Sequence, residues 1–314
     1  MLSSTLGAGN PKFVANTDRC DGLSESIRIA FTDFWHDHSE GSIRDHNPIF
    51  QMLPRHFLLS LSRQPDFLVY SWFGYRFLGH LCPRIFCTGE NIHPDFDQCD
   101  YAFSFDFPAE ERNYRLPLYR FYTHFDRLLE PRNHGLKYSQ RGFCNFVSSN
   151  AAARERIEFF ELLHRYRKVD SGGGLLNNVG GRVEDKLAFQ SRHRFSIALE
   201  NSSHPGYTSE KLIDALNAGT VPNYWGNPDA AMDFNPACMI NCHEFESFEA
   251  VVHHVIAVDR DEALFRPYLE APVFVDNEVP EFLREERIMS RFRQIFAGSA
   301  RSSSPGPSIR CSAS

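Results

Sequence analysis

Long apolar runs are missing from this 314-residue sequence. No run approaches the roughly 18 consecutive apolar residues that a membrane-spanning helix requires. Residues 1–16 also lack the charged-then-apolar layout of a secretory signal peptide. We therefore expect a soluble, cytoplasmic protein, whose contact with the inner membrane would be peripheral if it exists.

Paired cysteines are missing too. The eight cysteines form no Cys-x-x-Cys pair and are too sparse for a disulfide scaffold. We favour reduced thiols, mostly buried. Cys238, Cys242 and His243 would offer three zinc ligands, but no fourth follows at suitable spacing. Residues 36–38, His-Asp-His, are better read as a polar loop after a strand. The sequence therefore predicts no metal site.

Common phosphate-binding motifs are absent as well. The three glycines at residues 172–174 do not form the Gly-x-Gly-x-x-Gly turn of a dinucleotide site, and no phosphate loop with Gly-Lys-Ser/Thr occurs. A formal charge of -7 argues against general nucleic-acid binding. No Asp-x-Asp pair ends a strand in the C-terminal half, so a bound diphosphate would not require a metal. A divalent cation is left open only as a stimulant.

Apolar residues, by contrast, are numerous enough for two cores. The chain exceeds what one core usually spans, and 42% of it is hydrophobic, including 29 phenylalanines. Strand-like and helix-like segments alternate, as in parallel sheets with crossover helices. Strands are predicted at residues 26–34, 58–61, 67–71, 84–87, 101–105, 142–147, 195–199 and 220–225, and helices at 48–57, from 151, from 208 or 209, from 248 and over 284–296.

Two breaks divide the chain into parts. A polar stretch around residues 128–141 interrupts both periodicities, so we place the domain boundary there, with domains at residues 1–135 and 136–297. The serine-rich tail at 298–314 is predicted to be disordered. The helix at 284–296 has one apolar face beside four arginines. We expect it to pack on the first domain; the alternative is contact with anionic lipid.

The segment at residues 195–226 is the most informative. It comprises a short apolar strand, the polar loop ENSSHPG, a helix beginning near TSEK and a second strand. Ligands of such crossovers bind beyond the carboxyl ends of the strands, where helix N-termini favour phosphate. Glu210 and Lys211 therefore suggest a sugar bearing a phosphate. The alternative is a first-turn glutamate that favours the helix dipole beside a solvated lysine.

This segment resembles the donor-binding signature of the alpha-1,3/1,4-fucosyltransferase family. The resemblance rests on LENSS and GYTSEKL within residues 199–212 and on GTVP and YWG within 219–226. It extends to DFNP at 233–236, FVSSN at 146–150, GGG at 172–174, and more loosely to IFCTGEN at 85–91 and DYA at 100–102. The bacterial branch looks most similar.

The resemblance implies a fold and an activity. The fold would be GT-B, with two Rossmann-like domains facing each other across a cleft. The N-terminal domain would bind the acceptor and the C-terminal domain GDP-fucose. The implied activity is inverting alpha-1,3 transfer of L-fucose to N-acetylglucosamine of a lactosamine-type glycan. The alternatives are a GT-B transferase for another nucleotide sugar and a non-catalytic carbohydrate-binding relative.

Glu90 is the candidate general base. Inverting transfer needs a carboxylate that accepts the proton of the acceptor hydroxyl. Glu90 follows the predicted strand at residues 84–87, at a carboxyl end that faces the cleft, and matches the position of the family's proposed base. Without the resemblance, a surface loop glutamate would be the simpler interpretation.

Five more residues are implied by the resemblance to bind GDP-fucose. Arg156 and Lys211 would contact the diphosphate, where fixed positive charge stabilises the leaving group. Helical register alone would leave Arg154 as a competitor. Glu210 would accept hydrogen bonds from sugar hydroxyls, with Tyr207 beside it, and Asn201 would hold the loop or the nucleotide. Thr208 and Ser209 replace the family's usual Val-Thr, and His204 and Pro205 make this loop distinct.

Overall fold

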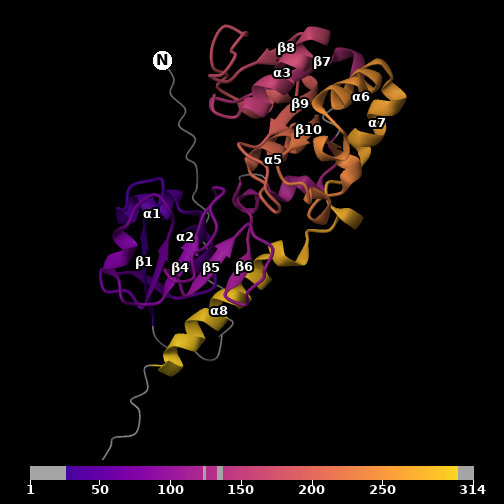
Figure 1. The fold of residues 1–314 in the computed structure, drawn as a ribbon. Helices are drawn as coiled ribbons and strands as arrows, with labels where there is room; N and C mark the ends of the chain where they lie inside the picture. The colour runs from indigo at the N-terminus through magenta and orange to yellow at the C-terminus, as the bar shows by residue number, and fades with distance from the viewer. Residues whose placement is uncertain (1–25, 123–124, 133–136, 303–314) are drawn as a thin grey trace, which may run out of the picture.

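The computed structural model describes residues 26–122, 125–132 and 137–302, and within them the chain forms two parallel sheets. Figure 1 shows these sheets in two lobes, each with its own helices. The predicted α/β class with two parallel sheets is confirmed. Among the described residues, no helix is both long and apolar enough to cross a membrane.

The first sheet has six strands in the order β2-β1-β3-β4-β5-β6, and all neighbours are parallel. The strands are β1 (Ile27–Thr32), β2 (Leu59–Leu61), β3 (Phe67–Tyr70), β4 (Arg84–Cys87), β5 (Tyr101–Ser104) and β6 (Asn113–Arg115). Two short helices follow β1, namely α1 (Glu40–His46) and α2 (Pro48–Met52). The side chains of Ser39 and Asn47 cap them by accepting backbone N–H groups.

The second sheet has five parallel strands in the order β11-β10-β9-β7-β8. Its strands are β7 (Gly142–Phe146), β8 (Val169–Ser171), β9 (His193–Leu199), β10 (Val221–Trp225) and β11 (Ile240–Asn241). Its helices are α3 (Arg154–Tyr166), α4 (Lys186–Gln190), α5 (Glu210–Asn217), α6 (Phe248–Arg260) and α7 (Glu262–Glu270). Central strand β9 is buried along its whole length, which explains its apolar sequence.

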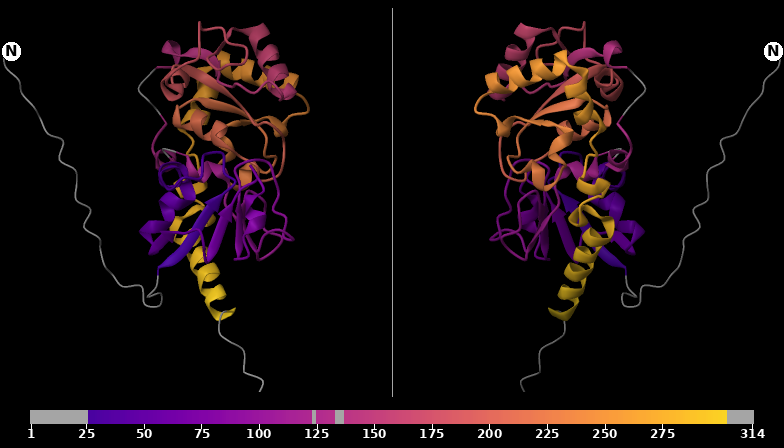
Figure 2. Two further views of the ribbon diagram at one scale, coloured as in Figure 1. Left: turned by 90° about the vertical axis from the view of Figure 1, so that its left-hand side faces the viewer. Right: turned by 90° about the vertical axis from the view of Figure 1, so that its right-hand side faces the viewer.

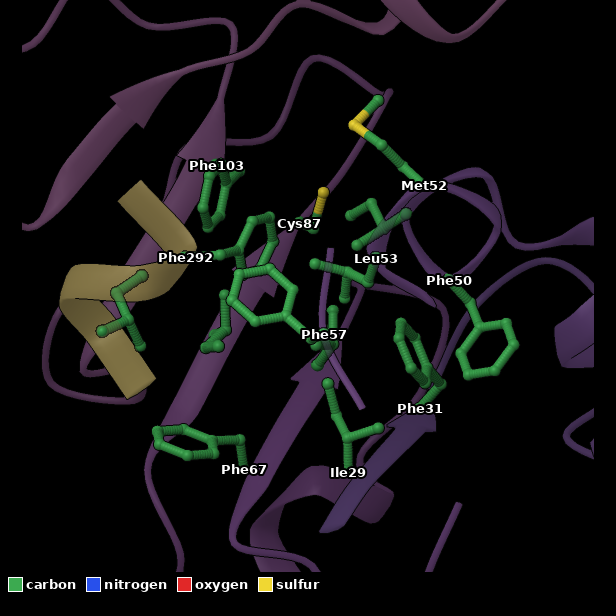
Figure 3. Close-up of a cluster of buried hydrophobic side chains, with 14 of the residues drawn as sticks. Ile29, Phe31, Phe50, Met52, Leu53, Phe57, Phe67, Cys87, Phe103 and Phe292 are labelled. Carbon is green, nitrogen blue, oxygen red and sulfur yellow. The ribbon is translucent and has the colours of Figure 1, made fainter. Parts of the chain in front are cut away.

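The last helix, α8 (Glu285–Ser302), returns to the first sheet. Figure 2 shows it running along the N-terminal lobe. Its apolar side chains Ile288, Phe292 and Ile295 are at most 1% exposed. In Figure 3, Phe292 faces Phe103 of β5, and their rings stack with centroids 4.3 Å apart. The lipid-binding alternative for this face is wrong, because the face is already buried in the core.

Short 3-10 helices complete the architecture. Three of them lie in the sequence between β6 and β7: η3 (Leu118–Phe121), η4 (Phe125–Leu129) and η5 (Tyr138–Gln140). The others are η1 (Leu53–Arg55), η2 (Arg76–Gly79), η6 (Ala230–Met232), η7 (Pro236–Cys238), η8 (Cys242–Glu244), η9 (Val275–Asn277) and η10 (Glu281–Leu283).

Two predicted helices have different bounds in the structure. The helix predicted at residues 48–57 ends at Met52 and continues as η1, because Pro54 has no N–H for a helical hydrogen bond. Helix α8 continues to Ser302, beyond the predicted start of the tail at residue 298. Residues 303–314 lie outside the described residues.

Candidate active site

A first cavity of about 880 Å³ lies at the carboxyl ends of the first sheet. Glu90, three residues beyond β4, is half-buried in its wall. Its backbone N–H donates to Thr88 Oγ1 over 3.1 Å, which orients the turn. The full lining is Trp35, His36, Asp45, His46, Pro48, Gln51, Phe73, Gly89, Glu90, Leu118, Phe121 and Tyr122. The cavity combines aromatic faces with the two carboxylates Asp45 and Glu90, a composition suited to a sugar.

A second cavity of about 580 Å³ lies at the carboxyl ends of the second sheet. Four of the predicted donor-site residues line it, and they come from two helices and one loop: Arg156, Asn201, Glu210 and Lys211. The remaining lining is Val147, Ser148, Ser149, Asn150, Gly172, Gly173, Arg182, Val183 and Lys186. Its cations and hydroxyls suit an anionic ligand rather than an apolar one.

Arg156 is held in place by four hydrogen bonds. Its Nε and Nη2 both donate to the Leu199 carbonyl, over 3.1 and 2.7 Å, at the end of β9. Nη1 donates to Ser148 Oγ over 2.8 Å, and Nη2 also donates to Asn201 Oδ1 over 2.9 Å. All three acceptors are neutral, and among the described residues no carboxylate lies within ion-pair distance of Arg156. Its positive charge is therefore available to a ligand, whereas Arg154 is exposed and outside the cavity.

Lys211 sits in a cluster of opposite charges. Its Nζ donates to Glu200 Oε2 over 3.0 Å and lies 3.2 Å from Glu210 Oε1. Glu200 is fully buried and also accepts the N–H and hydroxyl of Ser209. Burial lowers the pKa of Lys211, but Glu200 and Glu210 outweigh it, and the net shift is upward. Lys211 therefore stays charged at neutral pH and is fixed in direction.

Glu210 is ionised in this cluster. Burial by itself would raise its pKa, but Lys211 and then Lys186 outweigh burial and lower the pKa to about 2. An ionised carboxylate at this position can only accept hydrogen bonds. It is therefore suited to hydroxyl groups of a ligand in the second cavity.

Tyr207 does not line the second cavity. It is 3% exposed, and its ring meets Phe105 at the end of β5 edge-on, with centroids 5.3 Å apart. Burial, followed by the nearby carboxylates Glu200 and Glu90, raises its pKa. The structure thus places Tyr207 between the two lobes, and a role in sugar stacking stays a prediction.

The two cavities meet at a pair of contacts between the lobes. Tyr122 lines the first cavity and Glu210 lines the second. The Tyr122 hydroxyl donates to Glu210 Oε2 over 3.3 Å. Next to Glu90, Asn91 Nδ2 donates to Ser202 Oγ over 2.8 Å. The loop that carries Glu90 therefore touches the loop that carries Asn201, and the cavities share a wall.

A buried ion pair also joins the lobes. Arg115 at the end of β6 donates to Asp233 Oδ2 over 2.7 Å, and its guanidinium lies between the rings of Phe107 and Phe282. Nearby, Gly206 has a φ of 81°, and a Cβ there would lie 2.5 Å from the Phe105 carbonyl oxygen. The loop before α5 can therefore approach β5 only because residue 206 is glycine.

Four residues of the candidate site were not predicted from the sequence. Glu200 appeared only as part of the loop, although a carboxylate directly after an all-apolar strand is a usable signal, because such a group is buried and needs partners. Tyr122, Arg182 and Lys186 also line the cavities. Their positions come from segments without a recognisable motif, so no local pattern identifies them.

Two family models match the chain. The alpha-(1,3)-fucosyltransferase FucT N-terminal domain matches residues 29–122, and the glycosyltransferase family 10 (fucosyltransferase) C-terminal model matches residues 136–287. The alpha-(1,3)-fucosyltransferase FucT of Helicobacter pylori is 29% identical over 275 residues, which cover 73% of this chain and 56% of that protein. This chain therefore spans little more than half the length of that relative.

Solved structures agree with the family models. A crystal structure of an alpha1,3-fucosyltransferase with GDP-fucose has a TM-score of 0.73 and 25% identity, covering 87% of this chain and 92% of that one. Anabaena Alr3699/HepE, solved with UDP and glucose, has a TM-score of 0.52 at 7% identity over 87% of this chain and all of that one, which shows a shared fold alone. The predicted GT-B arrangement is confirmed.

Proposed function

This chain belongs to the fucosyltransferases of glycosyltransferase family 10, and we propose that it transfers L-fucose from GDP-fucose to a glycan with inversion. The acceptor would be N-acetylglucosamine of a lactosamine-type glycan, fucosylated at its 3-hydroxyl. One observation carries the proposal. The first cavity, which contains Glu90, and the second cavity, which contains Arg156, are adjacent and are joined by the hydrogen bond between Tyr122 and Glu210.

Glu90 acts as the general base in this proposal. The acceptor hydroxyl loses its proton to the Glu90 carboxylate while its oxygen attacks the anomeric carbon of fucose. The bond from that carbon to the diphosphate oxygen breaks on the opposite face, and GDP departs with the electron pair. The half-buried position of Glu90 in the aromatic cavity supports this role, because the carboxylate faces the space that an acceptor sugar would fill.

Arg156 stabilises the departing GDP. Its guanidinium already binds three neutral oxygens, so its orientation is set before a ligand arrives. A preorganised charge without a carboxylate partner interacts strongly with negative charge that develops during bond cleavage. Arg182 lines the same cavity and is exposed, so it supplies a second cation from the opposite loop.

Lys211 and Glu210 form the fucose side of the donor site. Lys211 contributes positive charge towards the diphosphate, although two carboxylates offset part of it. Ionised Glu210 accepts hydrogen bonds from the sugar or ribose hydroxyls, and Asn201 positions the loop through Arg156. Because these cations and the N-terminus of α5 meet the diphosphate charge, transfer proceeds without a metal ion.

Aromatic side chains provide the acceptor surface. Trp35 and Phe73 line the Glu90 cavity and are 52% and 43% exposed. Large exposed aromatic rings in a hollow present apolar faces, against which the C–H faces of a pyranose can pack. This feature supports a sugar acceptor rather than water or a small alcohol.

Product analysis tests the proposal. Purified protein is incubated with GDP-fucose and lactosamine-type acceptors, GDP release is measured, and the new linkage is determined by NMR. We expect GDP release that depends on acceptor and an alpha-1,3 product. Turnover with a different nucleotide sugar in a donor panel would favour the alternative transferase. Binding of GDP without turnover on any acceptor would favour the non-catalytic alternative.

A further inference from the structure

Two histidines and one aspartate from both lobes meet beside the shared wall of the cavities. His93 follows β4, Asp106 follows β5, and His204 lies in the loop after β9. One ligand atom from each of the three lies within 4.8 Å of the others. We propose that these side chains bind a zinc ion that links the two lobes.

The set of ligands suits zinc by its chemistry. Two imidazoles and one carboxylate are the ligands of open zinc sites, in which water takes a fourth position. Magnesium and calcium prefer oxygen ligands alone, so two histidines argue against them. Among the described residues, this is the one group of three or more such side chains whose ligand atoms lie so close together.

The hydrogen bonds around the group leave ligand atoms available. His204 Nδ1 lies 2.9 Å from the Pro205 carbonyl, which can only accept, so Nδ1 carries the proton and the lone pair is on Nε2. His93 Nδ1 donates to the Asp106 carboxylate and lies 2.9 Å from each of its oxygens, so a zinc ion bound between these two groups would take the place of that proton. The histidine and the carboxylate are therefore already together, and binding needs small shifts.

The group of His93, Asp106 and His204 is bordered by an apolar ring on one side and is open to solvent on the other. Buried Phe105 has its ring centroid 5.5 Å from the ring centroids of both His93 and His204. On the other side, the His93 side chain is 53% exposed, which gives a cation access from solvent. A partly desolvated carboxylate attracts a cation more strongly than one in water.

Zinc would strengthen an existing link between the lobes. His93 is three residues after Glu90, and His204 is two residues after Ser202, which accepts a hydrogen bond from Asn91. The ion would therefore hold the loop of the proposed base against the donor loop from a second point. It would act outside the sugar chemistry, so this inference extends beyond the proposed function.

Calorimetric titration of the full chain with zinc chloride alone tests the inference. After treatment with EDTA and desalting, the unaltered protein should bind one zinc ion per chain through this site. Mutation of a residue that only hydrogen-bonds to a metal ligand typically lowers metal affinity roughly 10- to 100-fold. His93→Ala and His204→Ala each remove a ligand itself, so each should lower the zinc affinity by more than that. His253→Ala, which removes an exposed histidine from α6, is the matched control and should leave it unchanged.

Thermal unfolding gives a second readout. Zinc should raise the unfolding midpoint of the unaltered protein and of His253→Ala, but not of Asp106→Asn. Because His93 is exposed, His93→Ala folds and remains informative even if His204→Ala does not. Equal zinc affinity in His93→Ala and the unaltered protein, or no stoichiometric binding at all, would overturn the inference. No sugar nucleotide is present, so these outcomes are independent of the transferase activity.

Discussion

The Glu200→Gln substitution tests how the charge cluster around Lys211 is held. Glu200 is fully buried and accepts from the Ser209 N–H over 2.8 Å, the Ser209 hydroxyl over 2.6 Å and Lys211 Nζ over 3.0 Å. Glutamine has the same shape but only one accepting oxygen. If that oxygen keeps the Ser209 N–H, the amide nitrogen faces the ammonium group, and two donors then confront each other.

The expected loss of stability follows from the remaining partners. Removing one side of a buried ion pair costs about 3–5 kcal/mol when the other charge is left alone. Here Lys211 keeps Glu210 at 3.2 Å and Ser209 Oγ at 2.8 Å. The loss therefore corresponds to one charged hydrogen bond, about 2 kcal/mol. For a domain of this size that lowers the unfolding midpoint by roughly 4–8 °C.

The pH dependence of this loss has a definite sign. The pKa of Lys211 is raised in the folded protein, so the stabilisation it provides is complete below its unfolded pKa of about 10.4. It is lost as pH rises through the folded pKa. The difference between Glu200→Gln and the unaltered protein should therefore be constant from pH 7 to about pH 9 and shrink above pH 10.4.

Differential scanning calorimetry of both proteins at pH 7.5 measures the effect. Glu158→Gln, at an exposed position on α3, is the matched control and should shift the midpoint by less than about 1 °C. If Glu200→Gln behaves like this control, Glu200 does not hold Lys211, and the account of the cluster is refuted.

Four further predictions concern the site. Glu90→Gln should lower turnover about 10²- to 10⁴-fold while GDP binding, measured by calorimetry, is unchanged; near-normal turnover would disprove the base assignment. Arg156→Lys loses at least one of the four hydrogen bonds, because an ammonium group has only three donors, so kcat/KM for GDP-fucose should fall about 100-fold; an unchanged value would show that this guanidinium does not contribute to catalysis. Gly206→Ala must keep a left-handed φ and approach the Phe105 carbonyl, so its unfolding midpoint should drop, in contrast to Gly41→Ala, where space is free. Glu210→Gln should be less stable than the unaltered protein at pH 7, with a difference that disappears as pH falls from about 4.3 through about 2; a difference independent of pH would exclude the ion pair.

Elements with strong local signals were predictable from the sequence. The run at residues 195–199 lies within central strand β9, and the apolar spacing after Ser209 coincides with helix α5. Strands β6, β8 and β11 were not predicted, because each spans only two or three residues and contains polar side chains. Such strands exist through pairing with a neighbour, which a single segment does not encode.

Some residues of the candidate site were likewise predictable from the sequence, and others were not. Glu90 follows a strand, whereas Arg156 and Lys211 lie in the first turn of a helix that follows a strand. The topology of a parallel sheet therefore places all three at the carboxyl ends of the strands. Glu200 and Tyr122 act through partners 11 and 88 residues away in the chain, and no spacing rule relates them. The sequence could therefore indicate which groups are charged, but not which of them neutralise each other.

Contacts between the lobes contribute to the separation between the proposed base Glu90 and the cations of the second cavity. Arg115 binds Asp233 across the interface, and Phe282, which covers its guanidinium, leads directly into α8 on the first sheet. Losing either charge would leave the other buried and unpaired, which costs about 3–5 kcal/mol. This ion pair therefore contributes to the contact between the lobes, although neither Arg115 nor Asp233 lines either cavity. The geometry of the proposed site should therefore depend on residues that line neither cavity.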